Sequence, residues 1–251
     1  MTEERQNAGE GGKSGQLKIF FGYAAGVGKT YAMLQAALMA EERGMDVVIG
    51  SIAPYRSLED TALAERLRAM ERLEKFDLDQ AIRRKPDLIL MDDLACENPR
   101  GSRHSRRYQD IRELLKAGIS VYTTVSAQNI ESLNDIVTAI TRVPVKDRIP
   151  DSVFDHADQV ELVDLEPREL LERLRNGVLA EKEGEQTPET AYFAVASLTA
   201  LREVALRRCA DRINMLTRGD GAAHGDEHVL VCLSASPSNA KIVRTAARMA
   251  N

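Results

Sequence analysis

The stretch "KIFFGYAAGVGKTYAML", residues 18–34, is the part of the sequence that is most informative about the fold. A short apolar run ends at Gly22, a glycine-containing loop follows, and a helical pattern begins near Thr30. This order of strand, loop and helix directs backbone N–H groups and the positive end of a helix toward one point, which suits a phosphate. We therefore interpret residues 22–30 as a phosphate-binding loop.

The loop departs at one position from the usual pattern G-x-x-x-x-G-K-[ST]. When the pattern is read back from Gly28, Lys29 and Thr30, it requires glycine at position 23, and the chain has Tyr23 there with Gly22 beside it. We expect Gly22 to supply the missing flexibility one residue earlier.

The expected ligand of this loop is ATP with Mg²⁺. The backbone of Gly26, Val27 and Gly28 would contact phosphate, because glycine lets the chain turn and approach an anion closely. Lys29 would neutralise the β- and γ-phosphates, and the hydroxyl of Thr30 would bind the metal. A chance "AGVGKT" between a strand and a helix is the alternative.

A second motif, "LILMDDLA", residues 88–95, places two acids at the end of an apolar strand. P-loop proteins hold magnesium with an acid at this place, so Asp92 is the metal-side candidate. Asp93 is the candidate for positioning the attacking water. It is one methylene shorter than the glutamate of many ATPases, so we expect hydrolysis to suffer more than binding. The alternative is a turn with solvated carboxylates.

Basic and polar residues follow this strand and the next one. The segment "RGSRHSRRYQD", residues 100–110, is either a γ-phosphate sensor or partner contact, or a solvated helix start with salt bridges to Asp110 and Glu113. The residues Thr123, Thr124, Ser126 and Gln128 could orient water or phosphate, or could simply cap a strand. Neither pattern decides between its two interpretations.

The rest of the chain alternates between strand and helix patterns. Strands are expected at 17–22, 45–52, 86–94, 119–125 and 158–165, and helices at 30–44, 57–73, 78–85, 105–118, 130–142, 166–177 and 189–216. Such crossovers predict an α/β fold with a mainly parallel, doubly wound, P-loop NTPase-like sheet covered by helices on both faces. The expected organisation is a disordered tail (1–16), one domain (17–216), a linker (217–227) and an incomplete C-terminal βα unit (228–251).

The composition excludes several classes of function. With 43% hydrophobic and 29% charged residues the chain is expected to be soluble and globular, and a net charge of −5 offers no general attraction to nucleic acid. We expect neither a membrane span nor an export signal, because no apolar run approaches the required length. Three cysteines without C-x-x-C spacing favour a reducing cytoplasm over a disulfide framework.

Four segments, in order, resemble the cytoplasmic N-terminal domain of the KdpD family, the potassium-responsive sensor histidine kinases of bacteria. They are "KIFFGYAAGVGKTYAML", "FDLDQAIRRKPDLILMDDLA", "GSRHSRRYQDIRELLKAGISVYTT" and "IESLND". The resemblance covers residues 17–216, and the shifted Gly22 fits a family loop that commonly reads G-A-C-A-G-V-G-K-T. The tail resembles the start of a universal-stress-protein-like domain, with a Ser234-Ala235-Ser236 turn, but the rest of a cyclic di-AMP site is absent, so we do not expect that ligand.

The resemblance implies an ATP-binding cytoplasmic regulatory module of a sensor kinase that controls potassium uptake. Its partner would be the remainder of that kinase or another signalling protein, and full-length relatives are membrane-anchored. We expect no histidine-kinase activity from these 251 residues and at most weak ATPase activity, because Asp93, Cys96 and Asn129 replace a glutamate and two histidines of the family. The alternatives are an independent P-loop ATPase or small-molecule phosphotransferase, and an adaptor that no longer binds nucleotide.

Overall fold

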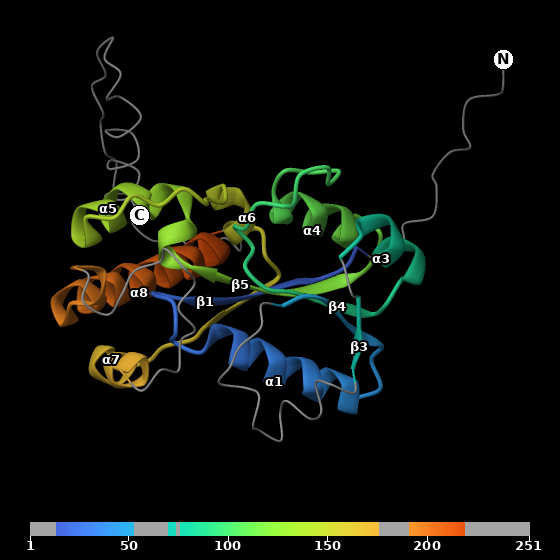
Figure 1. Ribbon diagram of the computed structural model, residues 1–251, viewed down its shortest axis with the longest axis horizontal. Coiled ribbons are helices and arrows are strands. Elements are labelled where there is room, and N and C mark those ends of the chain that lie inside the picture. Colours follow the sequence, from blue (N-terminus) through green and yellow to red (C-terminus); the bar gives the residue numbers. More distant parts are fainter. Residues whose placement is uncertain (1–13, 53–69, 74–75, 176–190, 219–251) are drawn as a thin grey trace, which may run out of the picture. The chain divides into compact units, whose positions relative to one another are not determined.

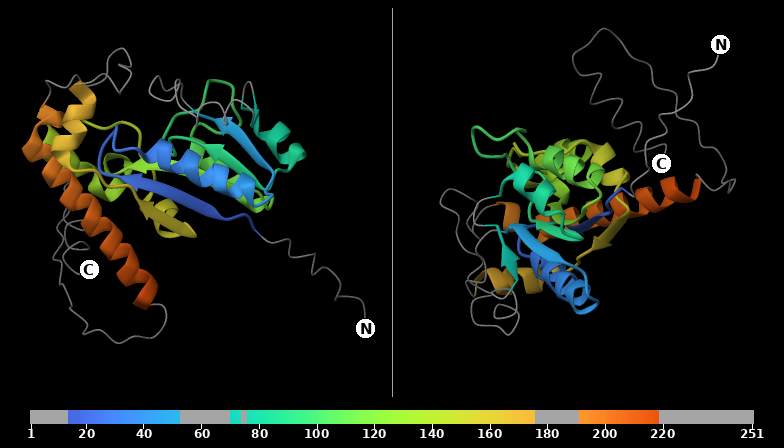
Figure 2. Two further views of the ribbon diagram at one scale, coloured as in Figure 1. Left: turned by 90° about the horizontal axis from the view of Figure 1, so that it is seen from below. Right: turned by 90° about the vertical axis from the view of Figure 1, so that its right-hand side faces the viewer.

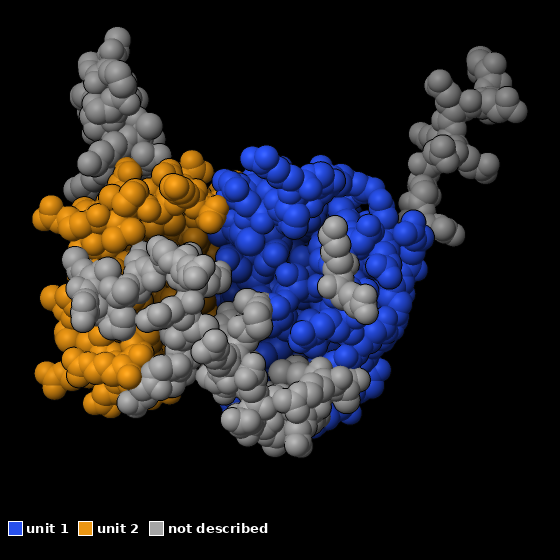
Figure 3. Space-filling view, in the orientation of Figure 1, with its two compact units in different colours: residues 1–20, 30–124, 157–159 blue, residues 21–29, 125–156, 160–251 orange. Residues whose placement is uncertain are grey.

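The structure is a computed structural model that describes residues 14–52, 70–73, 76–175 and 191–218. Within these residues the chain forms two compact units, coloured separately in Figure 3. Unit 1 contains residues up to 20, 30–124 and 157–159, and unit 2 contains 21–29, 125–156 and those from 160 onward.

Six parallel strands form one sheet in the order β3-β2-β4-β5-β1-β6. Their bounds are β1 (Leu17–Gly22), β2 (Val47–Ser51), β3 (Glu71–Arg72), β4 (Leu88–Met91), β5 (Ser120–Ser126) and β6 (Gln159–Leu162). Helices flank the sheet, which confirms the predicted α/β, doubly wound fold.

The register of the central strands brings their carboxyl ends to the same edge. Ile89 pairs with Val121, and Met91, the last residue of β4, pairs with Thr123 of β5. All four residues of β4 are buried. This explains their continuous apolar sequence, because a parallel sheet is covered on both faces. The residues that follow Met91 therefore leave the core at this edge.

Unit 1 carries its helices on both faces of its strands (Figure 1). They are α1 (Lys29–Glu42), α3 (Leu78–Arg84) and α4 (Arg107–Lys116). On the α1 side, Leu34 and Leu38 pack into one core cluster with Ile49 and Leu90. Gly44, two residues after the last residue of α1, has a φ of 87°, which is typical of a glycine that follows a helix end.

Unit 2 is built around α8 (Val195–Arg218), the long orange helix of Figure 2. This helix contacts α5 (Asn134–Thr141) and α7 (Pro167–Arg175). The guanidinium of Arg208 is buried, bonds to Asp155 of α6 (Asp151–Asp155) and lies 4.7 Å from the ring centre of Phe154. The described residues of this unit also form three short 3-10 turns: η2 (Ala127–Asn129), η3 (Glu131–Leu133) and η4 (Ala191–Phe193).

The structure corrects three element predictions. Residues 71–72 form β3, paired with β2, although they lie in the predicted helix 57–73. Residues 14–16, expected in the tail, are ordered: the N–H of Gly15 donates to the carbonyl of Leu115 at 2.8 Å, and a Cβ on Gly15 would lie only 2.0 Å from the carbonyl oxygen of Ile119. Helix α8 continues to Arg218, two residues into the predicted linker.

Several predictions fall on other parts of the chain. Residues 1–13, the predicted helix 57–73 up to residue 69, and the linker and βα unit beyond residue 218 lie outside the described residues.

Candidate functional site

The loop between β1 and α1 turns at two glycines. Gly26 and Gly28 have φ angles of 84° and 103°. These values lie in the region that residues with a Cβ adopt at a cost, so glycine is needed at both positions. A Cβ on Gly28 would have room, since its nearest neighbour, Val163, would be 3.9 Å away. The requirement at Gly28 is therefore conformational.

Gly22 is needed for a different reason than the expected flexibility. Its φ is not positive, and it ends β1 as part of the strand. A Cβ on Gly22 would lie 2.6 Å from Cγ2 of Val27 and 3.1 Å from Cγ of Lys29. Since Val27 is itself buried, the loop has little freedom to move away. The absence of a side chain at Gly22 lets the loop fold back over the strand end.

Tyr23, which occupies the usual glycine position, is an anchor of unit 2. Its side chain is fully buried, and its hydroxyl donates a hydrogen bond to the carbonyl of Leu165 at 2.8 Å. Burial, assisted by the negative charge of Asp164, raises the pKa of Tyr23 to about 12. The tyrosine thus ties the start of the loop to the segment that follows β6.

Lys29 bonds within its own loop. Its Nζ donates to the carbonyl of Ala24 at 2.8 Å. This contact ties the ammonium group to the backbone of the loop. A phosphate oxygen is a stronger acceptor for an ammonium group than a carbonyl is, because the hydrogen bond is then charge-assisted on both sides.

In unit 1, Thr30 and Asp92 face each other. The Thr30 hydroxyl lies 3.2 Å from each carboxylate oxygen of Asp92, and Asp92 is only 4% exposed. Magnesium binds oxygen at about 2.1 Å in octahedral geometry, which separates adjacent ligands by about 3 Å. The observed oxygen separations match that requirement. The described residues contain no group of three or more His, Cys, Asp or Glu side chains that could hold a metal.

The Asp92 carboxylate is fixed from the neighbouring strand. Thr124 of β5 donates its hydroxyl proton to Oδ1 of Asp92 at 2.6 Å, and accepts the N–H of Asp93 at 3.1 Å. On α4, Arg107 donates from Nη1 to the carbonyl of Asp92 and, at 3.4 Å, to that of Asp93. A strand and a helix distant in sequence thus hold one acidic dipeptide.

Asp93 differs sharply from Asp92. Its side chain is exposed, and its φ of 59° is left-handed. Aspartate tolerates this conformation better than most residues do. The structure therefore places the predicted metal-side acid in a buried network and the predicted water-positioning acid on the surface.

Two residues of the arginine-rich segment contact Glu113, as the second of its two interpretations predicts. Arg103 pairs with Asp79 at 2.5 Å and with Glu113 at 2.7 Å, and His104 lies 2.6 Å from Glu113. These bonds, first that from His104, lower the pKa of Glu113. The expected pairing with Asp110 is not seen: the donor to Asp110 is Asn98, at 2.7 Å, and burial raises the pKa of the Asp110 carboxyl.

Of the four polar residues around the end of β5, Thr124 alone bonds to Asp92. Thr123 Oγ1 and Gln128 Oε1 are buried and have no hydrogen-bond partner within the described structure. The sequence pattern raised Thr124 as a possible contact but gave no sign that it bonds to both acids. The hydrogen bonds from Arg107 to two backbone carbonyls could not be predicted from the sequence, because they depend on how α4 packs.

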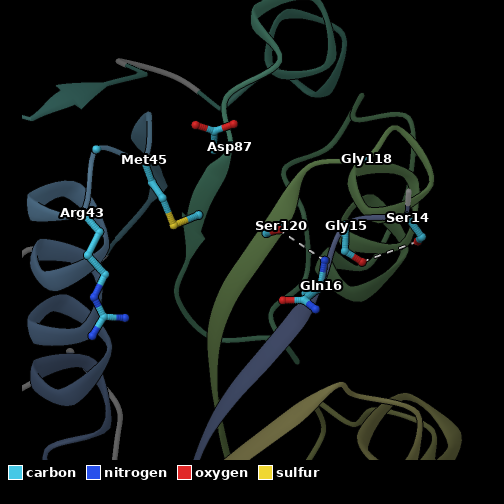
Figure 4. A pocket seen from close by; sticks show the side chains of 9 residues that line it. Ser14, Gly15, Gln16, Arg43, Met45, Asp87, Gly118 and Ser120 are labelled. Carbon is cyan, nitrogen blue, oxygen red and sulfur yellow. Dashed lines mark hydrogen bonds between the residues drawn. The ribbon is translucent and has the colours of Figure 1, made fainter. Parts of the chain in front are cut away.

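A cavity of about 460 Å³ lies at the opposite, amino-terminal edge of the unit 1 strands (Figure 4). It is lined by the following residues: Ser14, Gly15, Gln16, Arg43, Gly44, Met45, Asp87, Gly118 and Ser120. Ser120 begins β5, whereas Thr124 lies toward its other end. The cavity is therefore separate from the Thr30 and Asp92 pair. Among the helices in the described ranges, none has the length and apolar character needed to cross a membrane.

Comparisons with known proteins show which family the chain resembles. Residues 13–213 match the family described as "KdpD: Osmosensitive K+ channel His kinase sensor domain". The chain is 49% identical over 252 residues to "Sensor protein KdpD" of Clostridium acetobutylicum, covering 94% of this chain and 28% of that protein. It is 43% identical over 254 residues to the Escherichia coli K12 protein of that name, with the same coverages, and 37% identical over 253 residues to "Putative sensor protein KdpD" of Synechocystis, covering 95% of this chain and 68% of that protein.

The chain thus spans about 28% of the length of the first two relatives. The family match covers most of the chain and includes the loop, both acids and the arginine-rich segment. On these grounds the chain belongs to the KdpD family, and residues 13–213 are its sensor domain.

Proposed function

We propose that this chain is an ATP-binding regulatory module of a KdpD-type sensor kinase that governs potassium uptake. The module acts on the cytoplasmic side, together with the rest of a sensor kinase or another signalling protein. The observation that carries the proposal is the Thr30 hydroxyl, 3.2 Å from both oxygens of the buried Asp92 carboxylate. A hydroxyl and a carboxylate in this arrangement are the protein ligands that a P-loop protein uses for nucleotide-bound magnesium.

The loop supplies the phosphate side of the proposed site. Lys29, which precedes Thr30 in the chain, exchanges its bond to Ala24 for the β- and γ-phosphates. The backbone of Gly26, Val27 and Gly28 lines the phosphates, and the positive φ angles of the two glycines support this role. Bound ATP supplies the triphosphate charge that Lys29 neutralises and completes the coordination of magnesium.

The proposed role is regulatory, with weak hydrolysis at most. Asp93, the acid predicted to position the attacking water, is exposed and shorter than the glutamate usual at this place. The peptide N–H of Asp93 donates a hydrogen bond to the hydroxyl of Thr124. We expect ATP turnover far below the median enzyme value of about 10 s⁻¹, measured as phosphate release. Turnover near that value, or turnover stimulated by a small-molecule substrate, would instead support an independent ATPase or phosphotransferase.

Contacts within unit 2 offer a route from the loop to α8. Tyr23 bonds to Leu165, and the adjoining residues Asp164 and Glu166 form ion pairs with Arg202 of α8 at 2.6 Å and 2.5 Å. In the proposed mechanism ATP binds one arrangement of these contacts more tightly than another. The population then shifts by no more than this difference in affinity.

The test is a calorimetric titration of the chain with MgATP, beside Lys29→Ala. We expect binding in the micromolar range, about −8 kcal/mol, and its loss in the variant. Lys146→Ala, which removes an exposed lysine from the same unit, is the charge-matched control and should bind like the parent chain. GTP tests base preference, and cyclic di-AMP should not bind. Equal MgATP affinity in Lys29→Ala, or no MgATP binding by the parent chain, would overturn the proposal in favour of an adaptor.

A further inference from the structure

One peptide unit, the bond between Asp92 and Asp93, is held at both ends. Its carbonyl accepts from Nη1 of Arg107, and its N–H donates to the hydroxyl of Thr124 at 3.1 Å. Because a trans peptide is planar and its carbonyl and N–H point in opposite directions, fixing one end orients the other. Arg107 on α4 therefore helps to determine where the N–H of Asp93 is directed, although it does not touch Thr124.

The orientation of this N–H controls the hydroxyl of Thr124. With an oxygen lone pair occupied by Asp93, the hydroxyl directs its proton to Oδ1 of Asp92, at 2.6 Å. The same carboxylate faces the hydroxyl of Thr30. Hydrogen bonds arranged in series polarise and orient one another, so the chain from Arg107 to Thr30 acts as one network. All its members belong to unit 1.

Arg107 also supports an unfavourable backbone. Asp93 has a left-handed φ of 59°, and the second bond of Arg107, at 3.4 Å, is to the carbonyl of this residue. A strained conformation persists only where neighbouring contacts determine it. The side chain of the neighbouring Arg106 bonds to the carboxylate of Glu97 at 3.0 Å and to the carbonyl of Ala95.

We propose that Arg107 is a positioning residue for the magnesium carboxylate Asp92, acting through the Asp92–Asp93 peptide and Thr124. This inference rests on the proposed function, since it assigns a residue that sets the metal affinity of the same site. Residues that orient a metal ligand typically contribute 10- to 100-fold in metal affinity. Arg107 itself touches neither metal nor nucleotide in this assignment.

The experiment measures the Mg²⁺ concentration that half-saturates the enhancement of ATP binding, with ATP binding in EDTA as the second readout. Arg107→Ala should raise the half-saturating Mg²⁺ concentration about 10- to 100-fold and leave ATP affinity in EDTA unchanged. Arg107→Lys, which retains one donor, should restore part of the difference. Arg106→Ala is the matched control and should behave like the parent chain.

Thr124 gives a second way to test the network. Thr124→Val, which is nearly isosteric, should raise the Mg²⁺ requirement as Arg107→Ala does, and the double variant should be no worse than the stronger single one, because both act through the same chain of bonds. The assignment would be overturned if Arg107→Ala left the Mg²⁺ requirement unchanged, or if it weakened ATP binding in EDTA as much as it weakened MgATP binding. It would also be overturned if the effects of Arg107→Ala and Thr124→Val on the Mg²⁺ requirement were additive in the double variant. Failure of the parent chain to bind MgATP would instead refute the proposed function.

Discussion

The loop of residues 22–29 and the acidic strand end at residues 92–93 are held by different kinds of interaction. The loop owes its shape to space and backbone conformation: Gly22 leaves room for Val27, and Gly28 adopts a positive φ. The strand end owes its shape to hydrogen bonds from Thr124 and Arg107. At Gly22 and Gly28 the shape of the loop depends on residues close in sequence, whereas the strand end depends on residues brought together only by folding. The two regions should therefore fail in different ways when they are altered.

The largest effect is expected at Gly22, where the loop depends on the absence of a side chain. In Gly22→Ala the new Cβ would lie 2.6 Å from Val27, so the loop must shift. A displacement of about 1 Å can cost a site about 100-fold, and we expect MgATP affinity to fall by at least this amount in calorimetry. The matched control is Gly44→Ala: its φ is 87°, but nothing lies within 4 Å of the added Cβ, so stability should fall while affinity is kept. Parent-like affinity in Gly22→Ala would show that space does not shape the loop.

The next effect concerns the strand end. Asp92→Asn keeps the shape of the side chain but removes its charge, and we expect the Mg²⁺ requirement for ATP binding to rise about 10- to 100-fold. ATP affinity in EDTA should not fall, because Mg²⁺-free ATP makes no use of this charge. Asp93→Asn is the matched control: its side chain is exposed, so affinity should change by no more than about twofold. If the two variants change the Mg²⁺ requirement equally, the prediction that Asp92 rather than Asp93 binds the metal is wrong.

A smaller effect is expected from the hydroxyl of Tyr23, which anchors the loop. Tyr23→Phe leaves the carbonyl of Leu165 without this donor and should lower the free energy of unfolding by about 1 kcal/mol in urea denaturation. Tyr192→Phe is the contrasting variant, because the hydroxyl of Tyr192 is buried without a partner in the described structure. Its removal should cost nothing or stabilise the chain. Equal losses in both variants would mean that the bond to Leu165 contributes nothing.

The same tyrosine predicts a dependence on pH. The pKa of Tyr23 is raised from 10.0 to about 12. Above pH 10 the unfolded tyrosine ionises while the folded one keeps its proton, so stability is complete below that pH and falls as the pH rises to about 12. Tyr23→Phe should lose less stability over this range than the parent chain does. Identical slopes in the two proteins would contradict the assignment, and the loss due to Tyr192, whose pKa burial also raises, should remain in both.

The smallest effect tests the arginine-rich segment away from the strand end. Arg103 is exposed and pairs with Asp79 and Glu113. Exposed ion pairs contribute about 0 to 1 kcal/mol, and Arg103→Ala should lower stability by no more than this and leave MgATP affinity unchanged. A clear loss of affinity would revive the interpretation of this residue as a phosphate sensor.

Most of the fold could be predicted from local patterns. The bounds of β1 follow from an apolar run that ends at Gly22, and β4 is a buried strand whose sequence is apolar throughout. Residues 71–72 were predicted wrongly, because they continue a helical pattern in the sequence but pair with β2 in the fold. The short helix α6 was not predicted, since five residues give too little periodicity to recognise.

The candidate site likewise has one part that the sequence predicts and one part that it does not. The loop residues Gly26 to Thr30 and the acid Asp92 are visible as motifs because their spacing within short segments is fixed. The chain of bonds from Arg107 through Thr124 joins residues 15 and 32 positions away from Asp92. No periodicity or spacing rule predicts which of several arginines or threonines will close such a network. Tyr23 could be noticed as an exception to the loop pattern, but only the fold shows that its side chain is an anchor.

The length of α8 has a mechanical consequence. Arg202, whose ion pairs hold the helix to the segment after β6, lies 14 residues before Leu216, which is 53% exposed. At 1.5 Å per residue the two positions are about 21 Å apart along the axis. A tilt of only about 5° around Arg202 would displace Leu216 by about 2 Å, by the geometry of a rigid rod. A change in the ion pairs too small to disturb the surrounding core would thus be amplified at the far end of the helix.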